Sequence, residues 1–248
     1  IAIIPWYFRL YRRPLILCPI NNVKYIDIPG RCIIRHDLAV LSMSIETPIR
    51  SVFGISMDQL MNHPLSKALF VDKFLITNSQ LYEDKLWSFV IKKRLDKKLV
   101  EILKSIYELE AEGMNYVQHE GTYRLFLLMP DYSLTIDELG DGVKYALWII
   151  VIALLSKNGV LLIEEPELHQ HPANIKKLIE SLIRISLENS LQLFISTYSP
   201  IVIREIIESS SKLKLRANIY NLNIRNGVLE TRIIHGEEAE SVLEVKGS

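Results

Sequence analysis

The chain has 248 residues, of which 49% are hydrophobic and 23% are charged. This length and composition allow a sizeable buried core, so they exclude a disordered tail and fit one large or two small domains. The 29 basic and 29 acidic residues give no net charge. A nucleic-acid partner would therefore have to be contacted by a local basic patch rather than by the whole molecule.

The cysteines and the apolar runs bear on the compartment. Cys18 and Cys32 are the only cysteines in the sequence, which fits a reducing interior better than a disulfide scaffold. The longest apolar run, Ala146 to Leu155, is shorter than the roughly 20 residues that cross a bilayer. We therefore expect a cytoplasmic protein with no membrane partner, and we predict that this run forms a buried core helix.

The first third of the chain is the least informative part. Its pattern predicts strands at residues 11–20, 24–28 and 32–34, and a mixed, mostly helical segment at residues 57–91. No motif in this part predicts chemistry.

Five basic residues lie between Lys92 and Lys98, with Asp96 among them. They lead into a helix whose apolar positions are Leu99, Val100, Leu103, Ile106 and Tyr107. Such a group could contact a phosphate backbone. We favour a solvated helix face, because no aromatic residues that could stack on bases alternate with the basic ones.

A predicted hairpin, with strands at residues 116–118 and 123–129, precedes a glycine-containing helix start. There, Gly140 and Gly142 flank Asp141 just before the apolar run. The exposed N–H groups of a helix N-terminus favour an anion, which we expect to contact the backbone and Gly142 rather than the Asp141 carboxylate. The alternative is a simple cap, in which Asp141 caps the helix and the glycines make the turn. This segment alone leaves both interpretations open.

The central stretch combines a buried strand with two acids. Val160 to Ile163 are aliphatic enough for a strand buried on both faces, and Glu164 and Glu165 follow at once. Two adjacent carboxylates at the end of a buried strand are costly unless their charge is used. A hydrated Mg2+ ion is the commonest use, so the stretch predicts a magnesium site.

A second strand is predicted beside the first. An amphipathic helix with apolar positions from Ile175 to Ile185 leads to the buried strand Leu191 to Ile195 and the turn Ser196 to Pro200. A strand, helix and strand of this length form a right-handed βαβ unit, which places both carboxyl ends on one edge. We therefore expect the acid pair to lie beside this turn, where open α/β sheets bind ligands. Residues 217–234 predict a closing hairpin.

Taken in order, these segments resemble the carboxyl-terminal part of an ABC-type, AAA-like P-loop ATPase head of the SMC, RecF-like and overcoming-lysogenization-defect group. Leu139 to Val143 resemble the signature loop, Val160 to Glu165 the Walker B strand, Pro166 to Pro172 the D-loop, and Ser196 to Pro200 the switch loop. The resemblance implies an α/β fold, a P-loop NTPase sheet flanked by helices with antiparallel β-hairpins and an incomplete amino-terminal lobe. It also implies that residues 1–95 are the remainder of that lobe with a helical insertion and that residues 96–248 form the ATPase core.

The resemblance also implies roles for individual residues. Glu164 would hold Mg2+ through water, and Glu165 would polarise the water that attacks the γ-phosphate of ATP. Gly140, Asp141 and Gly142 of a second copy would close over that phosphate. The working unit would then be a homodimer with ATP between its heads, and DNA or a nuclease is a further expected partner.

The D-loop and the switch loop carry the remaining candidates. His169 and His171 would lie at the dimer interface, or would be plain loop residues that bind nothing. Thr197 would contact the nucleotide, and Tyr198 stands where the family generally has a histidine that touches the γ-phosphate. A phenol donates a hydrogen bond from a different distance, which predicts slow hydrolysis.

Two further departures from the family pattern concern the metal and the phosphates. Glu164 replaces the usual Asp. No Gly-x-x-x-x-Gly-Lys-Ser/Thr motif occurs in the sequence, which begins with Ile rather than Met. We expect that loop upstream of Ile1 or on another chain. The alternatives are a degenerate scaffold that does not hydrolyse ATP and the ATPase half of a nuclease complex.

Overall fold

The computed structural model describes residues 2–3, 35–36, 39–40, 68–73, 83–119, 121–225 and 228–235. Its contacts divide the chain into two compact units, one made of Ile1–Pro5 with Leu69–Ser248 and the other of Trp6–Ala68. The strands predicted at residues 11–20, 24–28 and 32–34 lie outside the described residues. The predicted domain boundary after residue 95 stays a prediction.

In the smaller unit, the described elements are two short strands. β2 (Arg35–His36) and β3 (Ala39–Val40) pair in antiparallel fashion.

The larger unit is built on a six-stranded sheet with the order β11-β10-β1-β9-β8-β4. β1 pairs in parallel with both β9 and β10, and β9 pairs in parallel with β8. The strands are β1 (Ala2–Ile3), β4 (Ala68–Val71), β8 (Val160–Glu164), β9 (Gln192–Ser196), β10 (Asn218–Arg225) and β11 (Val228–His235). Of the mixed, mostly helical segment predicted for residues 57–91, residues 57–67 and 74–82 lie outside the described part. Its helical character is confirmed at α4 (Glu83–Lys92), whereas β4 was missed, because periodicity cannot separate a short apolar strand from a helix.

The predicted βαβ unit is confirmed. β8 and β9 run in parallel from Val160 opposite Gln192 to Glu164 opposite Ser196, and α7 (Pro172–Glu188) connects them. Leu161 and Ile163 are fully buried, as the apolar run predicts for a strand covered on both faces. The carboxyl ends of both strands therefore meet at one edge of the sheet.

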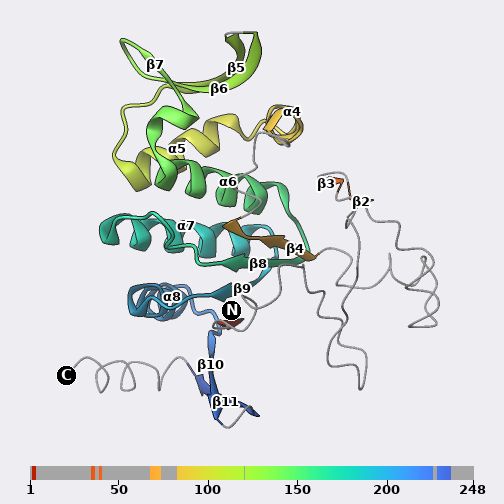
Figure 1. Ribbon diagram of the computed structural model, residues 1–248, viewed down its shortest axis with the longest axis vertical. Helices are drawn as coiled ribbons and strands as arrows, with labels where there is room; N and C mark the ends of the chain where they lie inside the picture. The colour runs from red at the N-terminus through yellow and green to blue at the C-terminus, as the bar shows by residue number, and fades with distance from the viewer. Residues whose placement is uncertain are drawn as a thin grey trace. The chain divides into compact units, whose positions relative to one another are not determined.

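The predicted core helix is α6 (Asp141–Leu155), in which every residue from Tyr145 onward is buried. A helix that is apolar all round must be covered by other elements. Figure 1 shows α6 between α5 (Asp96–Tyr107) and α7, and α4 (Glu83–Lys92) also packs against it. α8 (Pro200–Lys212) packs against α7. Among the described residues, no helix has the length and apolar character that crossing a membrane requires.

A second, three-stranded sheet leads the chain into α6. The predicted hairpin is confirmed as β5 (Gly113–His119) and β6 (Thr122–Leu128). β7 (Ser133–Thr135) adds a strand too short to predict, and the 3-10 helix η4 (Ile136–Leu139) follows it. Leu125 is the β6 residue just before those that pair with β7, and its amide donates to Oε1 of the buried Glu83 at 2.9 Å. This hydrogen bond ties α4 to the hairpin.

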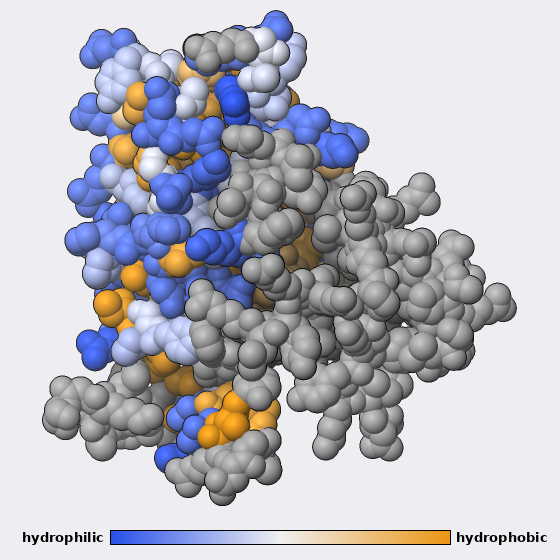
Figure 2. Space-filling view, in the orientation of Figure 1, coloured by the Kyte–Doolittle hydropathy of each residue, from blue (hydrophilic) through white to orange (hydrophobic). Residues whose placement is uncertain are grey.

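The β10–β11 hairpin closes the main sheet, as predicted. Of the residues of β10, Asn218 and Ile219 are the ones that pair with β1, so the described remainder of β10 has β11 as its partner. Ile219 is buried, whereas Ile224, Leu229 and Ile233 are exposed. Figure 2 shows apolar side chains gathered on this hairpin, while most of the coloured helical part of the same view is polar.

Candidate functional site

The acid pair lies where β8 ends. Glu164 is the last residue of the strand and stands opposite Ser196 at the end of β9. Glu165 leaves the strand with φ of +46°, and its N–H donates to the Ser196 carbonyl at 2.8 Å. A positive φ is uncommon outside glycine and turns the chain sharply. The structure thus brings both acids beside the turn that follows β9.

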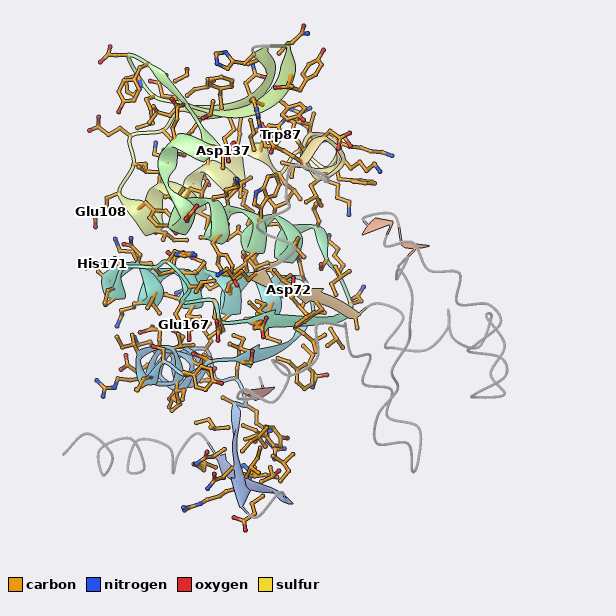
Figure 3. The ribbon with its side chains drawn as sticks, viewed as in Figure 1. Asp72, Trp87, Glu108, Asp137, Glu167 and His171 are labelled. Atoms are coloured by element: carbon orange, nitrogen blue, oxygen red, sulfur yellow. The ribbon has the colours of Figure 1, made fainter. Side chains whose placement is uncertain are left out.

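A buried tyrosine connects α6 to the same edge. The Tyr145 hydroxyl donates to the Glu164 carbonyl at 2.7 Å, and the residue is only 2% exposed. Its pKa is raised above the ordinary value, chiefly by burial and further by the carboxylates of Glu164, Asp72, Glu165 and Glu167. Asp72 directly follows β4, and Figure 3 labels it together with Glu167. Negative charge therefore gathers around this hydroxyl from β4, β8 and the loop after β8.

The carboxylates at this edge are the type of ligand that a hydrated divalent cation prefers. Within the described residues, no three His, Cys, Asp or Glu side chains are close enough to form a complete ligand set. Proteins commonly hold Mg2+ through one or two carboxylates, with waters and substrate phosphates completing the octahedron. Oε2 of Glu167 is buried and accepts no hydrogen bond from the described part of the chain. Oε2 of Glu167 is thus one carboxylate oxygen at this edge that could accept from a bound water or contact a cation.

Glu167 also joins the loop after β8 to the turn after β9. Its Oε1 accepts from the Thr197 hydroxyl at 2.5 Å and from the Tyr198 amide at 3.3 Å. The Thr197 oxygen in turn accepts from the Ser199 amide at 3.0 Å. Thr197 is 3% exposed and Tyr198 is 50% exposed. Thr197 therefore holds the turn in place, while Tyr198 is half-exposed.

The start of α6 has no side-chain cap. Gly140 is the N-cap residue, with φ of 85° and ψ of 158°, and no side chain bonds to the first turn there. Essentially only glycine adopts this backbone region. Asp141 is the first helical residue and is exposed, so the alternative in which it caps the helix does not match the structure. The N–H groups of the first turn are left for other partners.

Gly142 has a packing role that its sequence context did not reveal. A Cβ atom at this position would lie 2.5 Å from the His169 carbonyl oxygen. The Gly142 carbonyl accepts from Nε2 of Gln170 at 2.7 Å, and the Tyr107 hydroxyl lies 3.0 Å from it. The first turn of α6 therefore rests directly on the loop after β8.

The two histidines differ in their surroundings. His171 is the N-cap residue of α7, and its Nδ1 accepts from the Ala173 amide at 3.3 Å, which gives it a structural role. Figure 3 labels His171 at this end of α7. His169 is exposed, with φ of +61°. Its side chain is on the surface, while its carbonyl faces Gly142.

The basic group at Lys92–Lys98 is exposed along most of its length, as a solvated face predicts. Lys93 donates to the Leu155 carbonyl at 3.4 Å, and Lys98 forms an ion pair with Glu188. Two of the basic side chains thus contact neighbouring helices.

Sequence reasoning missed five residues of this region, namely Asp72, Tyr107, Tyr145, Glu167 and Gln170. Glu167 and Gln170 lie inside the motif stretch, and Tyr145 lies three residues after Gly142, which puts both on one face of a helix. These positions gave a usable signal. Asp72 and Tyr107 gave none, because only the folded chain brings them to the site.

The acids and the turn after β9 meet at the strand edge where open α/β sheets bind ligands. The chain belongs to the AAA ATPase domain family, whose model matches residues 72–203. A protein of Methanocaldococcus jannaschii, named only as the uncharacterized protein MJECL11, is 31% identical over 108 residues, which cover 44% of this chain and 92% of that protein.

Among solved structures, the chain is similar to one described under ATP-driven dimerization and DNA-stimulated activation of SMC ATPases. That match has a TM-score of 0.47 and 15% identity, and covers 66% of this chain and 98% of the other. The Smc head of Pyrococcus furiosus, bound to the C-terminal domain of ScpA, gives a TM-score of 0.45 at 13% identity over 68% of this chain. The Smc head of Pyrococcus yayanosii gives 0.46 at 14% identity, also over 68%. The match spans 42% of the first Pyrococcus chain and 31% of the second.

Proposed function

We propose that the complete protein hydrolyses ATP and that this chain supplies the acidic half of the catalytic site. The observation that carries the proposal is the pairing of Glu164 with Ser196, which sets two adjacent acids beside the turn at Thr197. Membership of the AAA ATPase domain family supports the same substrate. Ligands of open α/β sheets bind at this edge.

Each acid has its own role in this proposal. Glu164 would hold Mg2+ through water, and that ion would neutralise charge on the phosphates. Glu165, the first residue after the strand and with φ of +46°, would orient the attacking water and take up its proton. Thr197 keeps the neighbouring turn fixed through Glu167, and the half-exposed Tyr198 would contribute a donor to the γ-phosphate from that turn.

The working unit in this proposal is a homodimer. Gly140, Asp141 and Gly142 of one copy would close over the γ-phosphate held by the other, through the uncapped N–H groups at the start of α6. His169 and His171 would lie at the same interface. We further place the protein in the cytoplasm, with DNA or a nuclease as a partner that ATP binding controls.

The test is the rate of phosphate release from Mg2+ and ATP by the full-length protein. Glu165→Gln should lower kcat by about 10²–10⁴-fold, the usual contribution of a general base, with ATP binding retained. Glu101→Gln changes an exposed acid of α5 and is the matched control, expected to hydrolyse ATP at the wild-type rate. Equal rates for wild type and Glu165→Gln would refute the proposal.

A second candidate is a degenerate scaffold that does not hydrolyse ATP. Tyr198, in place of the family's histidine, favours this alternative. Under this alternative the wild-type protein releases no phosphate above background, and Glu165→Gln changes neither activity nor assembly. A dimer that forms with ATP only in Glu165→Gln would decide against the scaffold.

A further inference from the structure

We propose that Tyr107 and Gln170 are positioning residues that fix the start of α6 against the loop after β8. Together they are called the clamp below. The inference rests on the proposed ATPase function, because it assigns the clamp the task of keeping two parts of the interface in one arrangement. Neither residue belongs to the set that touches nucleotide in that proposal.

The hydrogen bonds of the clamp fix the orientation of the Gln170 side-chain amide. The Tyr107 hydroxyl lies 2.7 Å from Oε1 of Gln170 and 3.0 Å from the Gly142 carbonyl oxygen. A phenol has one proton, and the shorter contact assigns it to Gln170. That bond sets which way the Gln170 amide points, so that Nε2 donates to the Gly142 carbonyl at 2.7 Å.

The backbone contact beneath the clamp explains why the orientation matters. A Cβ at Gly142 would lie 2.5 Å from the His169 carbonyl oxygen, so the helix start packs closely against the backbone of the loop at this point. Gly142 has no side chain of its own that could hold the helix start in place against the loop. The Gln170 amide supplies that restraint from the loop, and Tyr107 supplies it from the end of α5.

Burial keeps the clamp in its donating form. Tyr107 is half-buried, and burial raises the pKa of its hydroxyl above the ordinary value. A phenol is already protonated at physiological pH, with an ordinary pKa of about 10, and burial moves the Tyr107 hydroxyl further from losing its proton. Its partner Gln170 is also half-buried, where an amide oxygen left without a donor is costly.

The clamp links two motifs, the start of α6 and the loop after β8. Gly140 to Gly142 begin α6, and His169 ends the turn on which they rest. Under the proposed function both face the partner copy, so a shift of one against the other would misplace the donors that close over the γ-phosphate. Misplacement by about 1 Å can cost roughly 10²-fold in rate, without weakening the first binding of ATP.

The first arm of the test needs no nucleotide. Amide hydrogen exchange is compared between the wild type and the variants Tyr107→Phe and Tyr132→Phe. Tyr132 is an exposed tyrosine between β6 and β7, so its variant is the matched control. Tyr107→Phe should speed exchange about tenfold or more at the hydrogen-bonded amides of Lys144, Leu168 and Gln170, and leave β8 and β9 unchanged. Unchanged exchange at those three amides would overturn the inference.

The second arm uses steady-state ATP hydrolysis by the full-length protein. Tyr107→Phe should lower kcat about tenfold to 10²-fold with KM for ATP unchanged, and Tyr132→Phe should match wild type. Gln170→Leu should act similarly, and the double variant should be no worse than the more damaged single one, because the two residues act as a unit. Additive losses, or a change in KM alone, would overturn the inference.

The two proposals can fail separately. If wild type hydrolyses no ATP, the proposed function fails and the exchange arm alone decides on the clamp. If wild type is active and Tyr107→Phe retains its kcat, the ATPase assignment stands and the clamp is refuted.

Discussion

Replacing Gly142 by Ala is the sharpest test of the close packing between the start of α6 and the loop after β8. In an ordinary helix this change is favourable by about 1 kcal/mol, because Ala is the better helix former. Here the new Cβ would lie 2.5 Å from the His169 carbonyl oxygen, whereas real Cβ contacts under 3.0 Å are essentially never seen. The closest atom is backbone, so the helix start and the loop must separate by about 0.5 Å.

The cost follows from that separation. Overpacking of this kind costs about 1–3 kcal/mol, and weakening the hydrogen bond from Gln170 to the Gly142 carbonyl adds about 1 kcal/mol. After the gain in helix propensity, we expect a net destabilisation of about 2 kcal/mol. For a domain of this size that lowers Tm by about 4–8 °C.

Thermal unfolding followed by circular dichroism measures the effect, with Gly113→Ala as the control. A Cβ at Gly113 would meet only the end of the Leu128 side chain at 3.6 Å, an ordinary contact. This variant should stay within about 0.5 kcal/mol of wild type. A Gly142→Ala protein that unfolds at or above the wild-type Tm would refute the close packing of Gly142 against the His169 carbonyl.

Two further changes address the polar links of the fold. Burial raises the pKa of Glu83 above its ordinary value, so the protonated form is favoured in the fold and the stability linked to this group falls as the pH rises through the raised pKa. Glu83→Gln keeps an acceptor for the Leu125 amide, so its Tm should exceed that of wild type at neutral pH and match it at about pH 3, where the Glu83 carboxyl is protonated in both the folded and the unfolded state. Thr197→Val removes the donor to Glu167 and the acceptor for Ser199, which should cost about 1–3 kcal/mol in urea unfolding. Thr197→Ser should recover most of that loss, and a Val variant as stable as wild type would contradict this role for the hydroxyl.

The parts of the fold that the sequence predicts are those in which local pattern and burial agree. The run from Val160 to Ile163 and the apolar spacing of α7 led directly to the parallel pair β8–β9, because a strand, helix and strand of that length have one favoured topology. β4 and β7 escaped prediction, since short strands carry too few residues for a period to be recognised. The helix α8 was likewise not foreseen.

The candidate site likewise has one part that the sequence predicts and another that only the folded structure reveals. The proximity of Glu164 to the turn after β9 follows from parallel topology alone, so the motif sufficed. The link from Glu167 to Thr197 depends on how a loop turns back on itself at Glu165 and His169, both with positive φ. Tyr107 comes from α5, far away in sequence, and only tertiary packing brings it to Gly142.

The central claim is that the acid pair at the end of β8 serves ATP hydrolysis. A single-turnover experiment tests it most directly, with full-length Glu165→Gln mixed with Mg2+ and a substoichiometric amount of ATP labelled on the γ-phosphate. The account predicts that ATP is bound as in wild type and that cleavage of the label is slowed by about 10²–10⁴-fold. Cleavage at the wild-type rate would contradict it.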